Sequence, residues 1–582
     1  MNLHNGSTII VYQNAFDIVV KASVLKTKHD CDLEMDVMVT DIEADTIFLN
    51  GKIITVDPKD TIAEAVAVKD GRILKLGSTA EIRRLAGSRT QVIDFEGKTV
   101  LPGFIDSHEH CIAGGLQVDS VSLASPPMRS IDDIVNALTL KAAEKPAGAW
   151  VQGSWWDESK LRERSFPTRY DLDRASTRHP IYIGRAGGHN AVANSLALKI
   201  AGIDRNTPQP QGGRIEKDQS GEPTGRLDEI AAMSLVRGKI PSPGPEEAVK
   251  MMVRHWPVVE ERLLSWGLTT VDEAHIKAPE ALAYQELLRE GKLHLRVGLM
   301  LDGMAPYGGY ATSDLARQGL RSGFGWGDRL RVIGVKLGVD GAMGSHTAAF
   351  HEPYENEPEN RGIVRVTQEE LTEETVRCHL AGLRVCIHAI GDRAVDMALD
   401  AVEEALKRKS WEDHRHRIEH AGYLEKPQLD RMKRLGVLPS ESIGFCYPIG
   451  DSHLWALGEH RMHGYYPMRT LKEYGIVAGG NSDGFGSNWA ITGIYGCVTR
   501  RTLEGQVLAE EQAISVMDAI RVYTINDAYL EGTEKEKGSL EPGKLADMVV
   551  LDRDILTVDP KEIIDTKALM TIVGGEVVYK RK

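Results

Sequence analysis

The sequence is poor in cysteine, and its few cysteines are scattered. There are six in 582 residues, and no two of them form a C-x-x-C pair. They are Cys31, Cys111, Cys378, Cys386, Cys446 and Cys497. This spacing in a long chain fits neither a disulfide framework nor a zinc ribbon. We therefore expect a cytoplasmic protein with reduced thiols.

Long hydrophobic runs are also missing. The best candidate, residues 7–25, is interrupted by Gln13, Asn14, Asp17 and Lys21. A transmembrane helix needs about 18–20 unbroken apolar residues. The same stretch lacks the basic start and the small-residue cleavage site of a signal peptide. No membrane association is expected.

The chain has no excess of positive charge. Lys and Arg number 70 against 84 Asp and Glu, which gives a net charge of −14. An acidic chain without a basic run argues against nucleic acid or an anionic membrane as the main partner. Hydrophobic residues at 42% and charged residues at 26% are ordinary globular values. The expected partner is a small-molecule substrate.

Both ends of the chain carry the pattern of short antiparallel strands. Residues 46–56 and 65–76 alternate apolar side chains around Asn50-Gly51 and Asp70-Gly71, which are strong hairpin signals. Residues 546–552 and 570–579 repeat this pattern. Each end has too few strands to be stable alone. We therefore predict one composite β-sandwich domain from residues 46–100 and 535–582. Residues 1–45 show no clear period and are expected to be an N-terminal extension.

Residues 101–534 alternate strand and helix patterns. Strands are predicted at 99–105, 267–272, 295–301, 330–337, 383–388, 416–420, 436–440 and 475–478, with helices such as 368–379 and 393–408 between them. Eight such units predict an α/β fold, a (β/α)₈ TIM-type barrel. The stretch of about 115–265 is too long for one crossover, so it is expected to be an insert that covers the barrel mouth.

Metal-binding residue types follow several of these strands. His108 and His110 are two apart on the first strand and project to one face. The later strands carry or lead to Lys336, His388, His420 and Asp483. Any one of these side chains could be a satisfied core residue, but their recurrence at one barrel face predicts a metal site of imidazole and carboxylate ligands.

Several longer motifs make the chain similar to a known family. They include residues 101–110 (LPGFIDSHEH), 340–348 (DGAMGSHTA), 388–394 (HAIGDRA) and 417–421 (RIEHA). The chain resembles the amidohydrolase superfamily, and within it the family 3 branch that contains N-substituted formamide deformylase and exoenzyme regulatory proteins. The resemblance runs from about residue 46 to the end.

The resemblance implies a binuclear metal centre, with zinc as the expected ion. His108 and His110 would hold the more buried ion and His388 and His420 the more exposed one, with Asp483 beside the buried ion. Lys336 would bridge both ions as a carbamate formed with CO₂. Asp483 would then move the proton from the nucleophile to the leaving nitrogen, and His189 is the candidate donor to the oxyanion.

Substrate contacts are less determined by the sequence. His346 stands where relatives usually carry arginine, Gly187 replaces a frequent polar residue, and Gly484-Phe485-Gly486 replaces a proline-containing turn. Together with Trp150 and Trp156, Trp155 lines an apolar substrate pocket or else packs the insert on the barrel.

The expected function is hydrolysis of a carbon–nitrogen bond in an amide, N-substituted formamide or carbamate. A deaminase, an ester or lactone hydrolase, and a non-catalytic regulatory binding protein are the alternatives. Lys336 favours the binuclear amide reaction over a one-metal deaminase. A homodimer is an expected assembly.

Overall fold

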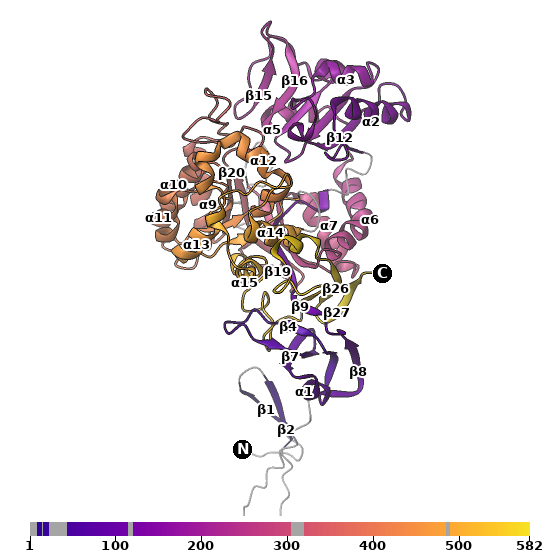
Figure 1. Ribbon diagram of the computed structural model, residues 1–582, viewed down its shortest axis with the longest axis vertical. Coiled ribbons are helices and arrows are strands. Elements are labelled where there is room, and N and C mark those ends of the chain that lie inside the picture. Colours follow the sequence, from indigo (N-terminus) through magenta and orange to yellow (C-terminus); the bar gives the residue numbers. More distant parts are fainter. Residues whose placement is uncertain (1–7, 14–15, 22–42, 114–119, 304–318, 485–488) are drawn as a thin grey trace, which may run out of the picture.

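The computed structural model describes residues 8–13, 16–21, 43–113, 120–303, 319–484 and 489–582. In Figure 1 the β sheets built from the two chain ends lie at one end of the molecule, a barrel lies in the middle, and an inserted α/β segment lies at the other end. No described helix is both long enough and apolar enough to cross a membrane. The five described cysteines are all buried and free.

Eight neighbouring strands build the central barrel, each parallel to the next. They are β10 (Phe104–Glu109), β17 (Leu268–Ile276), β18 (Arg296–Asp302), β20 (Leu330–Gly338), β21 (Val385–Ala389), β22 (Arg417–His420), β23 (Leu438–Glu441) and β24 (Gly479–Gly480). The short β19 (Gly325–Trp326) pairs antiparallel with β20. The first and last strands meet where Ser107 Oγ donates to Gly480 O at 2.9 Å. The predicted TIM-type barrel is confirmed.

Helices alternate with these strands and surround the barrel (Figure 1). They are α6 (Pro245–Leu264), α7 (Ala278–Arg289), α9 (Gln368–Leu380), α10 (Asp392–Arg408), α11 (Lys426–Leu435), α12 (Cys446–Leu457), α13 (Met468–Tyr474), α14 (Trp489–Thr499), α15 (Val516–Arg521) and α16 (Asp527–Glu531). Local signals set several boundaries. Helix α9 begins with a capping box between Thr367 and Glu370, and α11 ends at Gly436, whose φ is 72°.

The first predicted strand, 99–105, is two strands in two sheets. Strand β9 (Thr99–Pro102) belongs to a terminal sheet, and β10 begins the barrel two residues later. Gly103 makes the change possible, because a Cβ atom there would lie 2.2 Å from the side chain of Thr269. The Pro102-Gly103 pair inside the apolar run is a local sign of this change of sheet, and the predicted strand ran across it.

The last barrel strand is also displaced from its prediction. It is β24 at residues 479–480, not 475–478. A Cβ atom at Gly479 would lie 2.1 Å from Asp527 Oδ1, and one at Gly480 would lie 2.5 Å from the Tyr523 ring. Buried groups thus approach the backbone so closely that glycine replaces the β-branched residues typical of strands.

The insert contains a sheet of its own, which the sequence analysis did not predict. Its strands, in the order β11-β12-β13-β14-β16-β15, are β11 (Val121–Ser122), β12 (Val151–Trp156), β13 (Ile181–Arg185), β14 (Asn190–Ala193), β15 (Arg214–Lys217) and β16 (Pro223–Asp228). Its helices are α2 (Ile131–Ala143), α3 (Arg169–Ala175), α4 (Ser195–Ala201) and α5 (Glu229–Arg237). Separate buried clusters lie within this segment. Helix α6 leads into β17, so it belongs to the barrel although the predicted insert ran to 265.

Strands from both chain ends form two further sheets. One has the order β27-β26-β25-β9-β4-β5 and the other β7-β6-β3-β8. The strands are β3 (Ala44–Leu49), β4 (Lys52–Ile54), β5 (Ile62–Ala63), β6 (Ala65–Lys69), β7 (Arg72–Gly77), β8 (Ala86–Asp94), β25 (Met548–Leu551), β26 (Ala568–Val573) and β27 (Glu576–Lys580), with helix α1 (Thr79–Arg83). One hydrophobic cluster includes Phe48 of the second sheet and Met548 of the first. A separate β-sandwich domain stays a prediction.

The expected N-terminal extension is described only in part. Strands β1 (Thr8–Gln13) and β2 (Phe16–Lys21) form an antiparallel hairpin, although the sequence showed no clear period there. The rest of residues 1–42 lies outside the described residues.

Candidate metal centre

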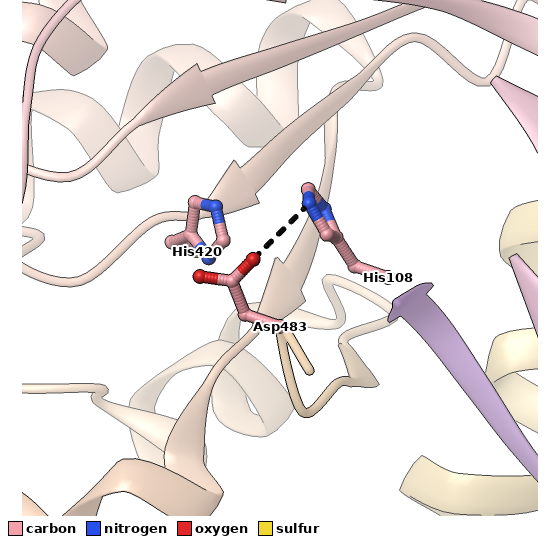
Figure 2. Close-up of side chains that lie close together, drawn as sticks. All are labelled: His108, His420 and Asp483. Atoms are coloured by element: carbon pink, nitrogen blue, oxygen red, sulfur yellow. Dashed lines mark ion pairs between the residues drawn. The ribbon is translucent and has the colours of Figure 1, made fainter. Parts of the chain in front are cut away.

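Three of the predicted ligands converge at the C-terminal end of the barrel. The ligand atoms of His108, His420 and Asp483 all lie within 4.8 Å of one another. Figure 2 shows the two imidazoles and the carboxylate facing one another, with His108 Nε2 3.6 Å from Asp483 Oδ1. His108 and His420 are 0% and 1% exposed. Strands β10 and β22 and the segment after β24 therefore bring three distant parts of the sequence to one point.

The other two predicted histidine ligands flank this group. His110 Nε2 lies 3.2 Å from Asp483 Oδ1. The ring centroid of His388 lies 4.6 Å from that of His420. His388 Nε2 donates to Gly341 O at 3.0 Å, which leaves Nδ1 as its ligand atom.

Lys336 reaches the same place from β20. Its side chain is 1% exposed, and its Nζ lies 3.0 Å from His108 Nε2. Burial lowers the pKa of Lys336 to about 8, although Glu419 and Asp483 act in the opposite direction. The neutral amine is therefore accessible near neutral pH.

The protonation states suit metal binding. Burial holds the pKa of His108 and of His388 well below the usual histidine range, and it lowers the pKa of His420 to about 3. Neutral imidazole is the form that binds a metal. Burial would by itself raise the pKa of Asp483, but His420, His110 and His108 hold it far below its usual range. Burial would lower the pKa of His110, but Asp483 raises it above the usual histidine value, so a metal ion competes with a proton for this ring. The centre thus combines three neutral histidines with an ionised carboxylate.

A network behind the ligands fixes their tautomers. His108 Nδ1 donates to Glu419 Oε2 at 2.6 Å, and Arg417 Nε donates to the other carboxylate oxygen at 2.6 Å. His420 Nδ1 lies 2.8 Å from Ser442 Oγ, which itself donates to Asn481. Both histidines therefore present Nε2 to the centre, the arrangement that carboxylates behind metal-binding histidines provide. Sequence reasoning missed these partners, and the paired Arg417 and Glu419 on a buried strand were their only signal.

Backbone strain accompanies the ligands. His420 and Asp483 have φ values of 73° and 54°, and His275 at the end of β17 has a φ of 56°. Such left-handed conformations are costly for residues other than glycine and recur at functional sites. The ring of His275 stacks on His110 with centroids 6.1 Å apart. His275 was not predicted, although it follows the same pattern of a histidine at a barrel strand end.

His189 brings the insert to the centre. It lies between β13 and β14, and its ring centroid is 5.5 Å from that of His388. Its Nδ1 lies 3.1 Å from both carboxylate oxygens of Glu229, and Arg365 Nη1 is 3.6 Å from the same carboxylate. Burial would raise the pKa of Glu229, but His189 and Arg365 hold it below the usual range. Glu229 was not predicted from the sequence.

The other two predicted substrate contacts, His346 and Trp155, belong to the loop after β20 and to β12 of the insert. His346 Nδ1 is 2.7 Å from Glu357 Oε1, and His346 lines a cavity of about 880 Å³ between insert and barrel. Trp155 is 40% exposed, and it is not among the described residues that line this cavity. Gly187 has a φ of 87°, which strains any side chain there, and Phe485 and Gly486 lie outside the described residues.

Comparison with known proteins identifies the family. The model of the amidohydrolase family matches residues 91–579. The chain belongs to the amidohydrolase family. The resemblance seen in the sequence is thereby confirmed, and the protein is a hydrolase that acts on carbon–nitrogen bonds.

Relatives of similar length support this assignment. N-substituted formamide deformylase of Arthrobacter pascens is 32% identical over 551 residues, which cover 92% of this chain and 98% of the relative. Protein LONG AFTER FAR-RED 3 of Arabidopsis thaliana is 32% identical over 557 residues, which cover 92% of each chain. The crystal structure of a metal-dependent hydrolase from Pyrococcus horikoshii OT3 is similar with a TM-score of 0.69 and 28% identity. It covers 89% of this chain and 99% of that one.

Proposed function

We propose that this amidohydrolase cleaves an amide, an N-substituted formamide or a carbamate at a binuclear metal centre. The convergence of His108, His420 and Asp483 with Lys336 against them carries the proposal. Two relatives agree with it: one is named for the deformylation of N-substituted formamides, and a structural neighbour is described as a metal-dependent hydrolase.

The residues fit a pair of divalent ions, with zinc the best match. His108 and His420 each use Nδ1 in a hydrogen bond to the surrounding protein and keep Nε2 for a ligand. We assign His108 and His110 to one ion and His388 and His420 to the other, with Asp483 beside the first. Imidazole and carboxylate ligands are those that zinc prefers. When bound, such ions acidify water and polarise a carbonyl group.

Lys336 would bridge the two ions as a carbamate. Its neutral Nζ attacks the carbon of CO₂, a nitrogen–carbon bond forms, and one proton leaves the nitrogen. The lowered pKa of Lys336, about 8, keeps part of the amine neutral at physiological pH. The product is an anionic, carboxylate-like ligand, which suits dications better than an ammonium does.

Two side chains would handle the chemistry at the substrate. Asp483 is ionised, so an oxygen of its carboxylate accepts the proton of the attacking water and returns it to the leaving nitrogen. His189 has its Nδ1 on Glu229, so Nε2 remains to donate to the developing oxyanion in the imidazolium form, with Glu229 as the counter-ion.

Metal analysis combined with a substrate panel tests this function. Protein purified without chelator should hold about two transition-metal ions per chain, and it should release amine from some member of a panel of formamides, anilides and carbamates. Metal-free protein would reject the metal centre. Activity confined to esters and lactones, or ammonia released only from ring amidines, would replace the proposed reaction with one of its alternatives.

Lys336→Met tests the bridge. It keeps the length of a buried side chain but cannot form a carbamate, so metal content and turnover should both fall while the melting temperature of the metal-free protein changes little. Partial rescue by short-chain carboxylic acids would support the bridging role. Full turnover without rescue would reject it.

We also propose a homodimer and a cytoplasmic location. Light scattering behind size-exclusion chromatography and cell fractionation measure these directly.

A further inference from the structure

A cavity of about 880 Å³ lies between the insert and the barrel, and none of the proposed metal ligands is among the described residues that line it. From the insert, it is lined by residues 158–160, 164–166, Glu216 and Arg226. From the barrel loops, it is lined by residues 344–346, Glu357, 448–449, 451–452, 454–455, 503–504 and 506. Its volume lies within the range of small-molecule sites, about 300–1,000 Å³.

One loop joins this cavity to the metal centre. Gly341, which follows β20, accepts the hydrogen bond from His388 Nε2. Gly344, Ser345 and His346 of the same loop line the cavity. Gly341 N donates to Thr347 O at 3.2 Å and closes the loop. The lining residue Gly344 is therefore three residues along the chain from Gly341, the hydrogen-bond partner of the proposed metal ligand His388.

Three charged side chains of the lining have partners in the protein. Arg226 donates to Asp228 at 2.7 Å and lies 3.8 Å over the Phe166 ring. Glu158 accepts two hydrogen bonds from Arg185, at 2.6 and 2.9 Å. Glu357 accepts from Asn360 and pairs with His346. These three side chains are therefore held in the cavity wall by their partners.

The remaining surface is apolar and aromatic. The His346 ring lies between Tyr354 and Trp455, with centroids 4.7 and 5.2 Å away. Trp455 is 59% exposed and Leu503 is 47% exposed, and Ile449 and Leu454 extend this surface. A ligand here gains free energy by covering large apolar side chains.

One polar atom in the lining has no partner. Ser345 is 1% exposed, and among the described residues none forms a hydrogen bond with its Oγ. A buried hydroxyl without a partner is costly. It marks the place where a ligand would supply one hydrogen-bonding atom.

The formal charges of the lining disfavour an anionic ligand. The five acidic residues are Glu158, Glu216, Glu357, Asp451 and Glu504, and the three basic ones are Lys160, Arg164 and Arg226. The surplus of two negative charges repels carboxylates and phosphates.

We propose that this cavity binds the non-reacting end of the substrate, a neutral aromatic group with one atom that hydrogen-bonds to Ser345 Oγ. The proposal rests on the proposed function and deepens it, because it names the substrate class as amides that carry an aromatic substituent. Trp455, which packs against His346, would stack on the ring, and Leu503 would cover its outer face.

Direct binding tests the cavity without turnover. The probe is acetophenone, a neutral aromatic ketone with one hydrogen-bonding atom and no carbon–nitrogen bond to cleave, and its dissociation constant is measured by ligand-observed NMR on the metal-loaded protein. Leu503→Trp narrows the cavity and should weaken binding at least tenfold, and Trp455→Ala should do the same. Ser345→Ala should weaken it about three- to tenfold. Leu380→Trp, at a 48% exposed leucine on α9 outside the lining, is the matched control and should leave it unchanged.

Turnover then separates the two proposals. With the wild-type enzyme, kcat/KM should be higher for an N-aryl amide than for its N-methyl counterpart, and Leu503→Trp should remove this preference by lowering kcat/KM more for the N-aryl amide than for the N-methyl amide. Equal effects on both substrates, or binding of acetophenone that no cavity variant weakens, would overturn the cavity proposal and leave the hydrolase standing. Cavity-dependent binding without hydrolysis of any amide would reject the proposed function and leave the binding site standing.

Discussion

Asp483 combines two roles that one substitution can separate. Its carboxylate lies 3.2 Å from His110 and 3.6 Å from His108, so it is both a ligand candidate and a proton acceptor. Asp483→Asn keeps an oxygen for a cation but cannot take up a proton near neutral pH. We expect kcat to fall about 10²–10⁴-fold and metal content to fall much less, both measured on one preparation. If the variant keeps its metals and turns over within a few-fold of wild type, another residue transfers the proton. His189 is then the first residue to test.

Glu419 positions His108 without being a proposed ligand. Its carboxylate receives the His108 Nδ1 proton and pairs with Arg417. Glu419→Gln leaves a weaker acceptor for His108 and removes the charge that faces a buried guanidinium. The metal dissociation constant should rise about 10–100-fold, measured by competition with a chromogenic chelator. Glu441→Gln on neighbouring β23 is the control, because burial raises the pKa of Glu441 well above its usual range and makes the amide a close match. Equal losses in both variants would contradict a specific role for Glu419.

At the scale of elements, the sequence predicted best where one strand or helix carries its own signal. Helices α9 and α10 lie within a residue or so of their predicted bounds, since α9 begins with a capping box and α10 has a continuous buried apolar face. The split at Gly103 and the short β24 were missed because both depend on side chains from distant segments that crowd the backbone, namely Thr269, Asp527 and Tyr523.

In the candidate centre, too, some residues could be predicted from the sequence and others could not. His108, His388 and His420 could be found because they sit at strand ends in recognisable motifs. Glu419, Ser442 and Glu229 act through partners on other elements, so their roles become visible only when the chain is folded. The insert's sheet was missed because no pattern in the sequence tells a covering segment from a folded unit with its own core.

Three buried histidines tie α9, β21 and β22 together at the barrel end away from the centre. His416 Nε2 lies 2.9 Å from His379 Nδ1, its Nδ1 accepts from Val385 N, and His414 Nδ1 accepts from His416 N. Burial, His414, His379 and Arg384 hold the pKa of His416 well below its usual range. Both ring nitrogens of neutral His416 therefore form a hydrogen bond.

This network predicts a loss of stability in mild acid. The pKa of His416 is lower in the folded chain than the unfolded value of about 6.5, so below that pH the unfolded chain binds more protons. The stability contributed by neutral His416 is complete above about pH 6.5 and is lost as pH falls. His416→Asn keeps the acceptor for Val385 N but cannot be protonated. Its melting temperature should be lower than wild type at pH 8 and should change less between pH 8 and 5.5. Parallel curves for both proteins would contradict this account.

The whole molecule depends on strands from opposite ends of the chain. Strand β25 lies between β9 and β26, with Met548 opposite Pro102. Asp547 accepts two hydrogen bonds from the buried Arg296 of barrel strand β18, at 2.6 and 2.9 Å. Thr571 Oγ1 donates to Leu264 O at the end of α6. The terminal sheet is therefore anchored to the barrel by pairing, charge and packing at once.

Removal of residues 542–582 should therefore prevent folding of the barrel, although the proposed metal ligands all remain. The deletion leaves β9 without its neighbour and exposes the apolar faces that Val549 and Leu551 cover in the main core. It also takes Asp547 from the buried Arg296, which among the described residues keeps only the ion pair with Asp328 at 3.0 Å. Loss of a buried ionic partner is destabilising, and a typical protein is stable by only about 5–15 kcal/mol. We expect the chain that ends at Glu541 to accumulate in the insoluble fraction.

Deletion of residues 1–42 is the matched control of similar length. It ends before β3 and removes the β1–β2 hairpin, whose strands pair with each other. We therefore expect soluble protein with near wild-type turnover. Soluble, active protein from the C-terminal deletion would show that the barrel folds without the strands of the chain's end.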